Sequence, residues 1–75
     1  METLLAILND LHPDVDFTAE TGLIDKGILD SFDIVTIVAE IDGEFGAAIP
    51  AEALVPENFN SAKALYALVQ RLLAQ

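Results

Sequence analysis

The chain has 75 residues, and its thirteen acidic side chains against three basic ones give a formal net charge of −10. Acidity on this scale makes nucleic acid and anionic membrane surfaces poor partners and favours basic protein surfaces. Apolar residues make up 53% of the chain, which favours one packed domain over disorder, and the lack of cysteine excludes disulfides and thiolate metal sites.

The first predicted element is a helix over Glu2–Leu11. Pro13 ends it, because the residue before a proline avoids the helical region. His12 is the only histidine, and at a helix end it is more often a partner of the helix dipole than a catalyst. One face of this helix is apolar, at helical spacing, and carries Leu4, Ile7, Leu8 and Leu11, with Leu5 beside them.

A long connection follows, from His12 to Leu29. A segment of this length without regular structure is unusual in a compact domain unless its own apolar residues dock on the core. We expect a short helical turn at 18–22. The residues expected to dock are Val15, Phe17, Leu23, Ile24, Ile28 and Leu29.

The same connection has the spacing of a calcium loop, at Asp14, Asp16, Thr18, Glu20, Gly22 and Asp25. An EF-hand needs glycine at its sixth position and prefers glutamate at its twelfth, where this chain has Ala19 and Asp25. We therefore predict no metal site of this type. Weak binding of divalent cations by the clustered acids stays open.

The stretch from Gly27 to Gly46 predicts one amphipathic helix. Asp30 is the expected N-cap, Asp33 can close a capping box, and Gly46 is placed to end the helix. Ser31 then occupies the first helical position, where a side chain projects into solvent. The apolar face carries Ile34, Ile37, Val38, Ile41 and Phe45, and the polar face carries Asp33, Thr36, Glu40 and Glu44.

Two features exceed the needs of a core helix. Phe32, Val35 and Ala39 form a third strip beside the core face, which we expect to be partly exposed. Ser31 places a reachable hydroxyl at a helix N-terminus, which favours an anion such as a phosphodiester. Because Asp30 and Asp33 repel a free anion, a phosphate here is expected to be held covalently.

Residues 47–60 are predicted to be irregular, because Pro50 and Pro56 break any continuous helix. Turns are expected at 51–54 and 56–59, with Pro56 at a first-turn position. The residues of this stretch expected in the core are Ile49, Leu54 and Phe59.

Asn60 or Ser61 is expected to cap the last helix, which runs to about Leu73. Its buried face carries Leu65, Leu68, Val69 and Leu72, with Tyr66 at the edge of the core. The predicted fold class is therefore all-α. It is a small bundle of three main helices plus a short helix before the last, with the long loop between the first two helices.

The sequence Asp30-Ser31-Phe32-Asp33, preceded by Gly27-Ile28-Leu29 and followed by the apolar helix, resembles the phosphopantetheine attachment motif of acyl carrier proteins. The resemblance covers nearly the whole chain, including the pattern Phe45-Gly46…Ile49-Pro50 after the second helix. The segment Val55–Ser61 looks closer to stand-alone aminoacyl carriers, such as D-alanyl carrier proteins, than to fatty-acid carriers.

This resemblance implies a carrier and not an enzyme. A phosphopantetheinyl transferase would attach 4′-phosphopantetheine from coenzyme A to Ser31, and the terminal thiol would hold an acyl or aminoacyl group as a thioester. The residues themselves show no enzyme site, since a Ser-His-acid triad would need His12 beside Ser31 and an oxyanion hole. No glycine-rich phosphate loop or zinc pattern is present.

The resemblance also implies that the second helix is the docking surface for the transferase and for adenylating or acyltransferase enzymes with basic patches. Thr36 and Gly43 depart from the acidic pattern of fatty-acid carriers, which argues against docking to standard fatty-acid enzymes. The Pro56–Ser61 segment favours an amino acid or a specialised acyl group as cargo. The implied docking residues are Asp30, Phe32, Asp33, Val35, Ala39, Glu40, Asp42 and Glu44.

Three alternatives stay open. The first is a carrier for ordinary fatty-acid synthesis, and the second is a small acidic interaction module without a prosthetic group. The third, a calcium-binding helical protein, is disfavoured by Ala19 and Asp25. No apolar run approaches the ~18 residues of a membrane span, and the N-terminus has no basic region typical of a secretory signal. We therefore expect one domain over 1–75 that is monomeric, cytoplasmic and not inserted in a membrane.

Overall fold

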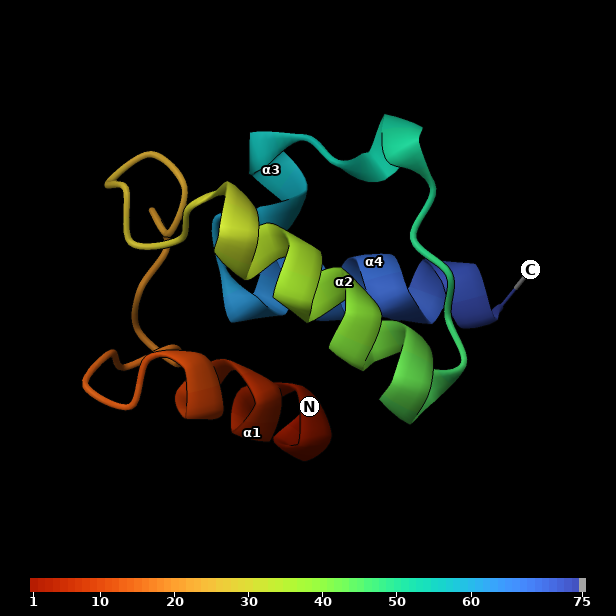
Figure 1. The fold of residues 1–75 in the computed structure, drawn as a ribbon, viewed down its shortest axis with the longest axis horizontal. Coiled ribbons are helices and arrows are strands. Elements are labelled where there is room, and N and C mark those ends of the chain that lie inside the picture. Colours follow the sequence, from red (N-terminus) through yellow and green to blue (C-terminus); the bar gives the residue numbers. More distant parts are fainter. Residues whose placement is uncertain (75) are drawn as a thin grey trace.

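The computed structural model describes residues 1–74, which form helices, turns and loops without a β-strand. Three main helices dominate the view in Figure 1, where α2 crosses in front of α4 and the long loop lies at one end. The elements are α1 (Glu2–Leu11), α2 (Ser31–Phe45), the 3₁₀ turn η1 (Ala51–Ala53), α3 (Pro56–Phe59) and α4 (Ala62–Leu73). The predicted fold class is confirmed, including the short helix before the last.

Local signals set the helix ends as predicted. His12 follows α1 with φ −137° and ψ 79°, outside the helical region, as a residue before proline requires. Asp30 caps α2, and Gly46 ends it in the left-handed conformation with φ 66°. Ser61 caps α4 by accepting a hydrogen bond from the Ala64 N–H at 3.0 Å.

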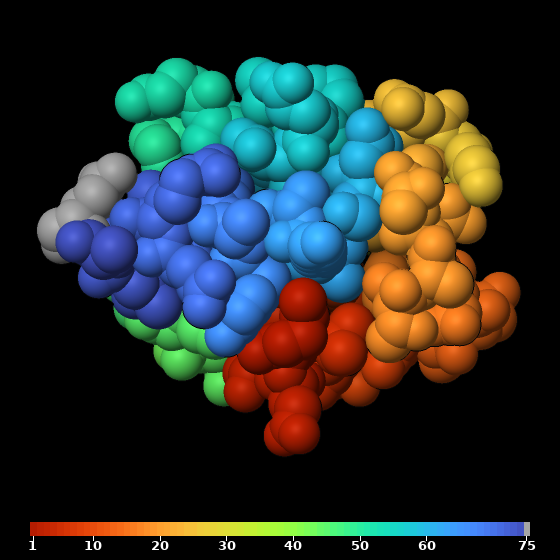
Figure 2. All heavy atoms as spheres, turned by 180° about the vertical axis from the view of Figure 1, so that it is seen from behind, coloured from red at the N-terminus to blue at the C-terminus, as the bar shows by residue number. Residues whose placement is uncertain are grey.

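The core joins the inner faces of α1, α2 and α4 with side chains from the connecting segments. The long loop docks as predicted, with Phe17, Leu23 and Leu29 buried, while Val15, Ile24 and Ile28 pack against the core from outside. Figure 2 shows the rear of the molecule, where the start of α1 and the loop lie beside the first turns of α4. The buried apolar residues are Leu4, Ile7, Leu8, Phe17, Leu23, Leu29, Ile37, Ile41, Ala47, Phe59, Ala62, Leu65, Leu68 and Val69.

Leu54 contradicts the core prediction, since 46% of it is exposed. Phe59, from α3, is fully buried instead, and Leu54 lines an open hollow outside it. The 3₁₀ turn over Ala51–Ala53 ends at Leu54 and leaves it on the surface. Ile49 and Leu72 are partly buried and pack against the core.

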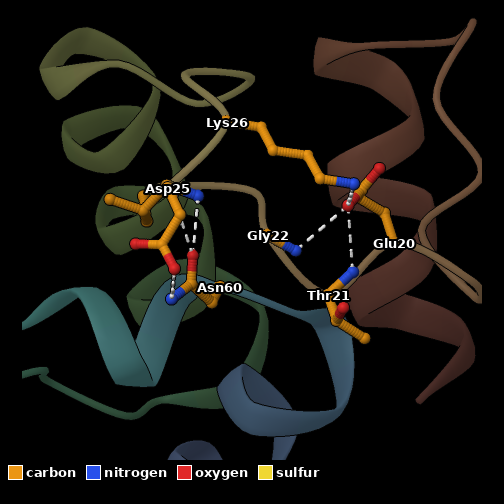
Figure 3. Close-up of polar contacts among 7 residues, drawn as sticks. Glu20, Thr21, Gly22, Asp25, Lys26 and Asn60 are labelled. Atoms are coloured by element: carbon orange, nitrogen blue, oxygen red, sulfur yellow. Dashed lines mark hydrogen bonds and ion pairs between the residues drawn. The ribbon is translucent and has the colours of Figure 1, made fainter.

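Asn60 has a different role from the cap that the sequence left open. Its side-chain oxygen accepts hydrogen bonds from the backbone N–H groups of Ile24 and Asp25, at 2.9 and 3.1 Å. Its backbone carbonyl accepts from the Leu23 N–H at 2.9 Å. Figure 3 shows Asn60 below the loop, with its amide nitrogen also directed at the Asp25 carboxylate. Asn60, two residues before α4, therefore fixes the loop segment that leads to α2.

The loop itself begins with a short turn at 13–14 and then forms two longer turns. The first of these longer turns spans 17–19, slightly earlier than the helical turn expected at 18–22, and the other spans 23–27. Between them the Glu20 carboxylate accepts from the N–H groups of Thr21 and Gly22 and pairs with Lys26 at 3.0 Å (Figure 3). Gly27 then takes a left-handed φ of 72°, a conformation in which glycine carries no steric cost.

Gly43 offers a direct test of the stability of α2. A Cβ built on Gly43 meets no atom within 4 Å, and the backbone there is helical. We expect Gly43→Ala to raise the free energy of unfolding by about 1 kcal/mol, because alanine loses less backbone entropy in a helix. Urea unfolding measures the change.

Gly46→Ala is the matched control for that substitution. Its added Cβ also meets no atom within 4 Å, but Gly46 has a φ of 66°. Alanine in that conformation should lower the stability by about 1 kcal/mol. If both variants shifted the unfolding curve in the same direction, the backbone explanation would be wrong.

Candidate functional site

The candidate site is the N-terminus of α2, and Ser31 is its first helical residue. The Asp30 carboxylate accepts from the Asp33 N–H at 2.9 Å, and the Asp33 carboxylate accepts from the Asp30 N–H at 3.2 Å. This reciprocal capping box was predicted, and it encloses Ser31 on both sides in the chain. Ser31 is exposed, and within residues 1–74 no hydrogen bond engages its hydroxyl.

The chain segment that leads into α2 is held in place by the core and by backbone hydrogen bonds. Leu29 is buried in the core, and its N–H donates to the Leu23 carbonyl at 3.0 Å. The Leu23 N–H in turn donates to the Asn60 carbonyl. Leu29, the residue before the cap, is therefore anchored both in the core and, through Leu23, to the segment that precedes α4. Ser31 thus has an exposed hydroxyl on a backbone segment that the core holds in place.

A contact that the sequence did not indicate supports the capping box from α1. His12 Nε2 lies 2.9 Å from Asp33 Oδ2, and both side chains are mostly shielded from solvent. The interpretation of His12 as a dipole partner missed this contact. The two residues are 21 positions apart in the sequence, with the long loop between them. No sequence spacing indicates that a histidine before such a loop contacts an aspartate in the helix cap after it. His12 binds Asp33 and not the Ser31 hydroxyl, so the atoms do not form a triad.

His12 also affects the ionisation of Asp33. Its hydrogen bond holds the pKa of the Asp33 carboxyl below its ordinary value, and hydrogen bonds from Asp30 act in the same direction, while burial opposes them. A lowered pKa in the folded state adds stability that is present above the ordinary pKa of about 3.9. That stability is lost as the pH falls through the lowered value.

This linkage predicts the behaviour of Asp33→Asn. The variant should be less stable than the wild type at pH 7, and the difference should shrink as the pH falls below the ordinary carboxyl pKa of about 3.9 toward the lowered pKa of Asp33. Urea unfolding of both proteins at pH 7, 5 and 3 measures this. Comparing the two proteins at each pH removes the general effect of the other carboxyl groups. A difference that stayed constant over this range would contradict the linkage.

The third strip of α2 is exposed, as predicted. Phe32 is 83% and Val35 67% exposed, and Ala39 is exposed one turn further on. Large apolar side chains this open, in a row that begins beside Ser31, are typical of a surface that another protein covers. The predicted acidic docking residues Asp30, Glu40, Asp42 and Glu44 are exposed on the same helix, whereas Asp33 is partly buried and bound by His12.

A small apolar hollow lies beside the start of α2, with a volume of about 130 Å³. Cavities of ~150 Å³ are known to hold a benzene molecule, so this hollow suits a small side chain better than a long acyl chain. Its lining residues are Ile24, Ile34, Leu54, Val55, Pro56 and Phe59. A larger hollow of about 360 Å³ lies elsewhere, where the start of α1 meets the loop and the first turn of α4.

The described residues give the calcium-loop alternative no support. Within residues 1–74, no group of three or more histidine or acidic side chains is placed to hold a metal ion. Asp16 binds Thr18, which lowers the pKa of Asp16, and Glu20 binds Lys26. Among the same residues, no helix has the length and apolar character to cross a bilayer.

Comparisons with known proteins identify a family model and several relatives that span most of this chain. Residues 2–69 match the protein-family model described as "Phosphopantetheine attachment site". The chain is 30% identical over 73 residues to the D-alanyl carrier protein of Streptococcus suis, covering 96% of this chain and 92% of that protein. It is 31% identical over 71 residues to D-alanyl carrier protein 1 of Lactiplantibacillus plantarum, covering 93% and 89%.

A third relative is aminoacyl carrier protein 2 of Bradyrhizobium diazoefficiens, 34% identical over 64 residues, which cover 85% of this chain and 64% of that protein. No solved structure shows significant similarity to the chain.

Proposed function

We propose a function on the premise that this chain belongs to the phosphopantetheine-attachment family of carrier proteins. Ser31 carries 4′-phosphopantetheine, and the terminal thiol of that group holds an aminoacyl residue as a thioester for transfer between partner enzymes. The observation that carries the proposal is the exposed Ser31 hydroxyl inside the capping box, within the matched range 2–69. The family itself accounts for the cofactor, whose thiol supplies the sulfur that this cysteine-free chain lacks.

The residues at the start of α2 fit such a group. The capping box uses the N–H of Asp33, and the Ile34 N–H donates to the Asp30 carbonyl at 3.1 Å. Within residues 1–74 no hydrogen bond engages the N–H groups of Ser31 and Phe32. Free N–H groups at the positive end of a helix favour a phosphodiester on the neighbouring hydroxyl.

The attachment step uses the Ser31 oxygen as the nucleophile. In the active site of a separate transferase, this oxygen bonds to the phosphorus of coenzyme A that bears the pantetheine. The pyrophosphate bond breaks, adenosine 3′,5′-bisphosphate leaves with the electron pair, and a base of the transferase takes the hydroxyl proton. This chain supplies the nucleophile and its position, and His12 is bound to Asp33 and not placed to take the Ser31 proton.

An amino acid is the proposed cargo. Relatives named D-alanyl and aminoacyl carrier proteins support this choice, as does the hollow of about 130 Å³ beside α2. Thr36 and Gly43 also depart from the acidic pattern of fatty-acid carriers, which makes a role in ordinary fatty-acid synthesis the weaker alternative.

The exposed side of α2 is the proposed docking surface for the transferase and for an adenylating enzyme. Phe32 and Val35 supply apolar contact area, and the exposed acids along the helix complement basic patches on these partners. The high negative charge supports a monomer through self-repulsion. One domain over 1–75 is proposed because the described helices share one core. The cytoplasmic location stays a prediction.

Intact mass spectrometry tests the function. The wild-type protein is incubated with coenzyme A and a broad-specificity phosphopantetheinyl transferase, and we expect a mass gain of one 4′-phosphopantetheine. With ATP, an adenylating enzyme and an amino acid, the modified protein should gain an aminoacyl group that hydroxylamine removes, as it does from thioesters. No mass gain in the folded wild type, with a known carrier modified in parallel, would favour the interaction module without a prosthetic group.

A further inference from the structure

The contact between His12 and Asp33 is the only side-chain hydrogen bond within residues 1–74 that joins the end of α1 to the start of α2. Its length is 2.9 Å, and both side chains are mostly shielded from solvent. Hydrogen bonds to a charged group in such surroundings are stronger than exposed ion pairs, which contribute little. The contact is therefore strong enough to restrain the capping box at the start of α2.

The His12–Asp33 contact restrains the two residues of the capping box, Asp30 and Asp33, which flank Ser31. The Asp33 Oδ2 atom that His12 contacts also accepts from the Asp30 N–H at 3.2 Å. Asp33 in turn donates its N–H to the Asp30 carboxylate at 2.9 Å. Without His12, the Asp30 N–H at 3.2 Å would be the one hydrogen bond left to limit rotation of the Asp33 carboxylate among residues 1–74. His12 restrains that rotation from a second helix, so the residues on both sides of Ser31 are held from outside α2.

We propose that His12 is a positioning residue for the modification of Ser31, which it serves through Asp33 and the capping box. The inference rests on the proposed function. A transferase must align the Ser31 oxygen with a phosphorus atom, and small losses of alignment slow such steps considerably. The same geometry gives Asp33 an internal role, because its carboxylate is already engaged by His12 and Asp30, in contrast to the exposed Glu40 and Asp42.

Three variants isolate the hydrogen bond. His12→Ala removes the donor and the bulk, and His12→Leu removes the donor but keeps most of the bulk. His12→Gln retains an N–H donor at a similar distance from the backbone. Circular dichroism melting verifies that each variant is folded, and the comparison of leucine with glutamine stands if the alanine variant is not. The Asp33 charge stays in all three.

The first readout is the steady-state kinetics of the transferase, with coenzyme A saturating and the carrier varied. We expect kcat to fall about fivefold for His12→Ala and His12→Leu, with KM nearly unchanged, because one charge-assisted hydrogen bond is lost. His12→Gln should recover most of the loss. The second readout needs no transferase: amide hydrogen exchange at Asp33 should become faster in the two variants without a donor.

Each other result has a definite meaning. An unchanged kcat in His12→Ala and His12→Leu overturns the inference, and so does an equal loss in His12→Gln, which would indicate shape alone. A lower KM without His12 would show that the histidine masks a docking charge on Asp33, which also overturns it. If the wild type itself is not modified, the proposed function fails first, and the two failures are thereby distinguished.

Discussion

Ser31→Ala should abolish the mass gain with coenzyme A and the transferase, while the free energy of unfolding changes by less than about 0.5 kcal/mol. The two parts of this expectation have separate causes. The hydroxyl is the only atom of the side chain that can form the phosphodiester, so its removal leaves no residual reaction at that residue. Ser31 is exposed, its hydroxyl has no hydrogen bond within residues 1–74, and alanine is favoured in helices. Intact mass and urea unfolding on the same sample measure both quantities.

Ser61→Ala is the matched control, because Ser61 is the only other serine of the chain. Its hydroxyl accepts from the Ala64 N–H and caps α4, so alanine should cost about 1 kcal/mol of stability. The modification should nevertheless proceed. The two serines thus give opposite patterns, one losing function at constant stability and the other losing stability at constant function. A mass gain in Ser31→Ala, located elsewhere by fragmentation, would refute the assignment of Ser31.

Replacing Phe32 and Val35 together by alanine should raise the KM of the carrier for the transferase about thirtyfold, as expected from the loss of about 2 kcal/mol at a central interface contact. Both side chains are mostly exposed, at 83% and 67%, so their truncation removes little buried area and the stability should hardly change. An intact fold with weakened docking is the signature of a surface used for binding. The KM values come from the same transferase assay as the test of function.

Leu73→Ala provides the control for a general effect of exposed apolar area. Leu73 is exposed near the end of α4, and Figure 1 places that end of the molecule away from the start of α2. We expect its truncation to leave the KM unchanged. An equal KM for the double variant and the wild type would contradict the docking surface and leave Phe32 and Val35 without a function.

Local signals in the sequence determined most of the helix ends and the position of the site. Pro13, Asp30, Gly46 and Ser61 act on the backbone within a few residues of themselves, so their effects do not depend on the rest of the fold. Helical periodicity likewise identified the buried faces, because an amphipathic helix packs its one apolar face against the core and leaves its polar face in water. The attachment motif was evident for the same reason, since its capping box and its serine lie in four consecutive residues.

Only the tertiary structure decided how distant polar groups meet. His12 reaches Asp33 across 21 positions, and Asn60 reaches the N–H groups of Ile24 and Asp25 across 36 and 35. Leu54 lies on the surface at the end of the 3₁₀ turn, whereas Phe59 is buried in the core. A sequence pattern shows which groups need partners, but the partner is whichever group the packed helices bring within about 3 Å. That choice depends on the docking of the loop and the helices together, and local patterns do not contain it.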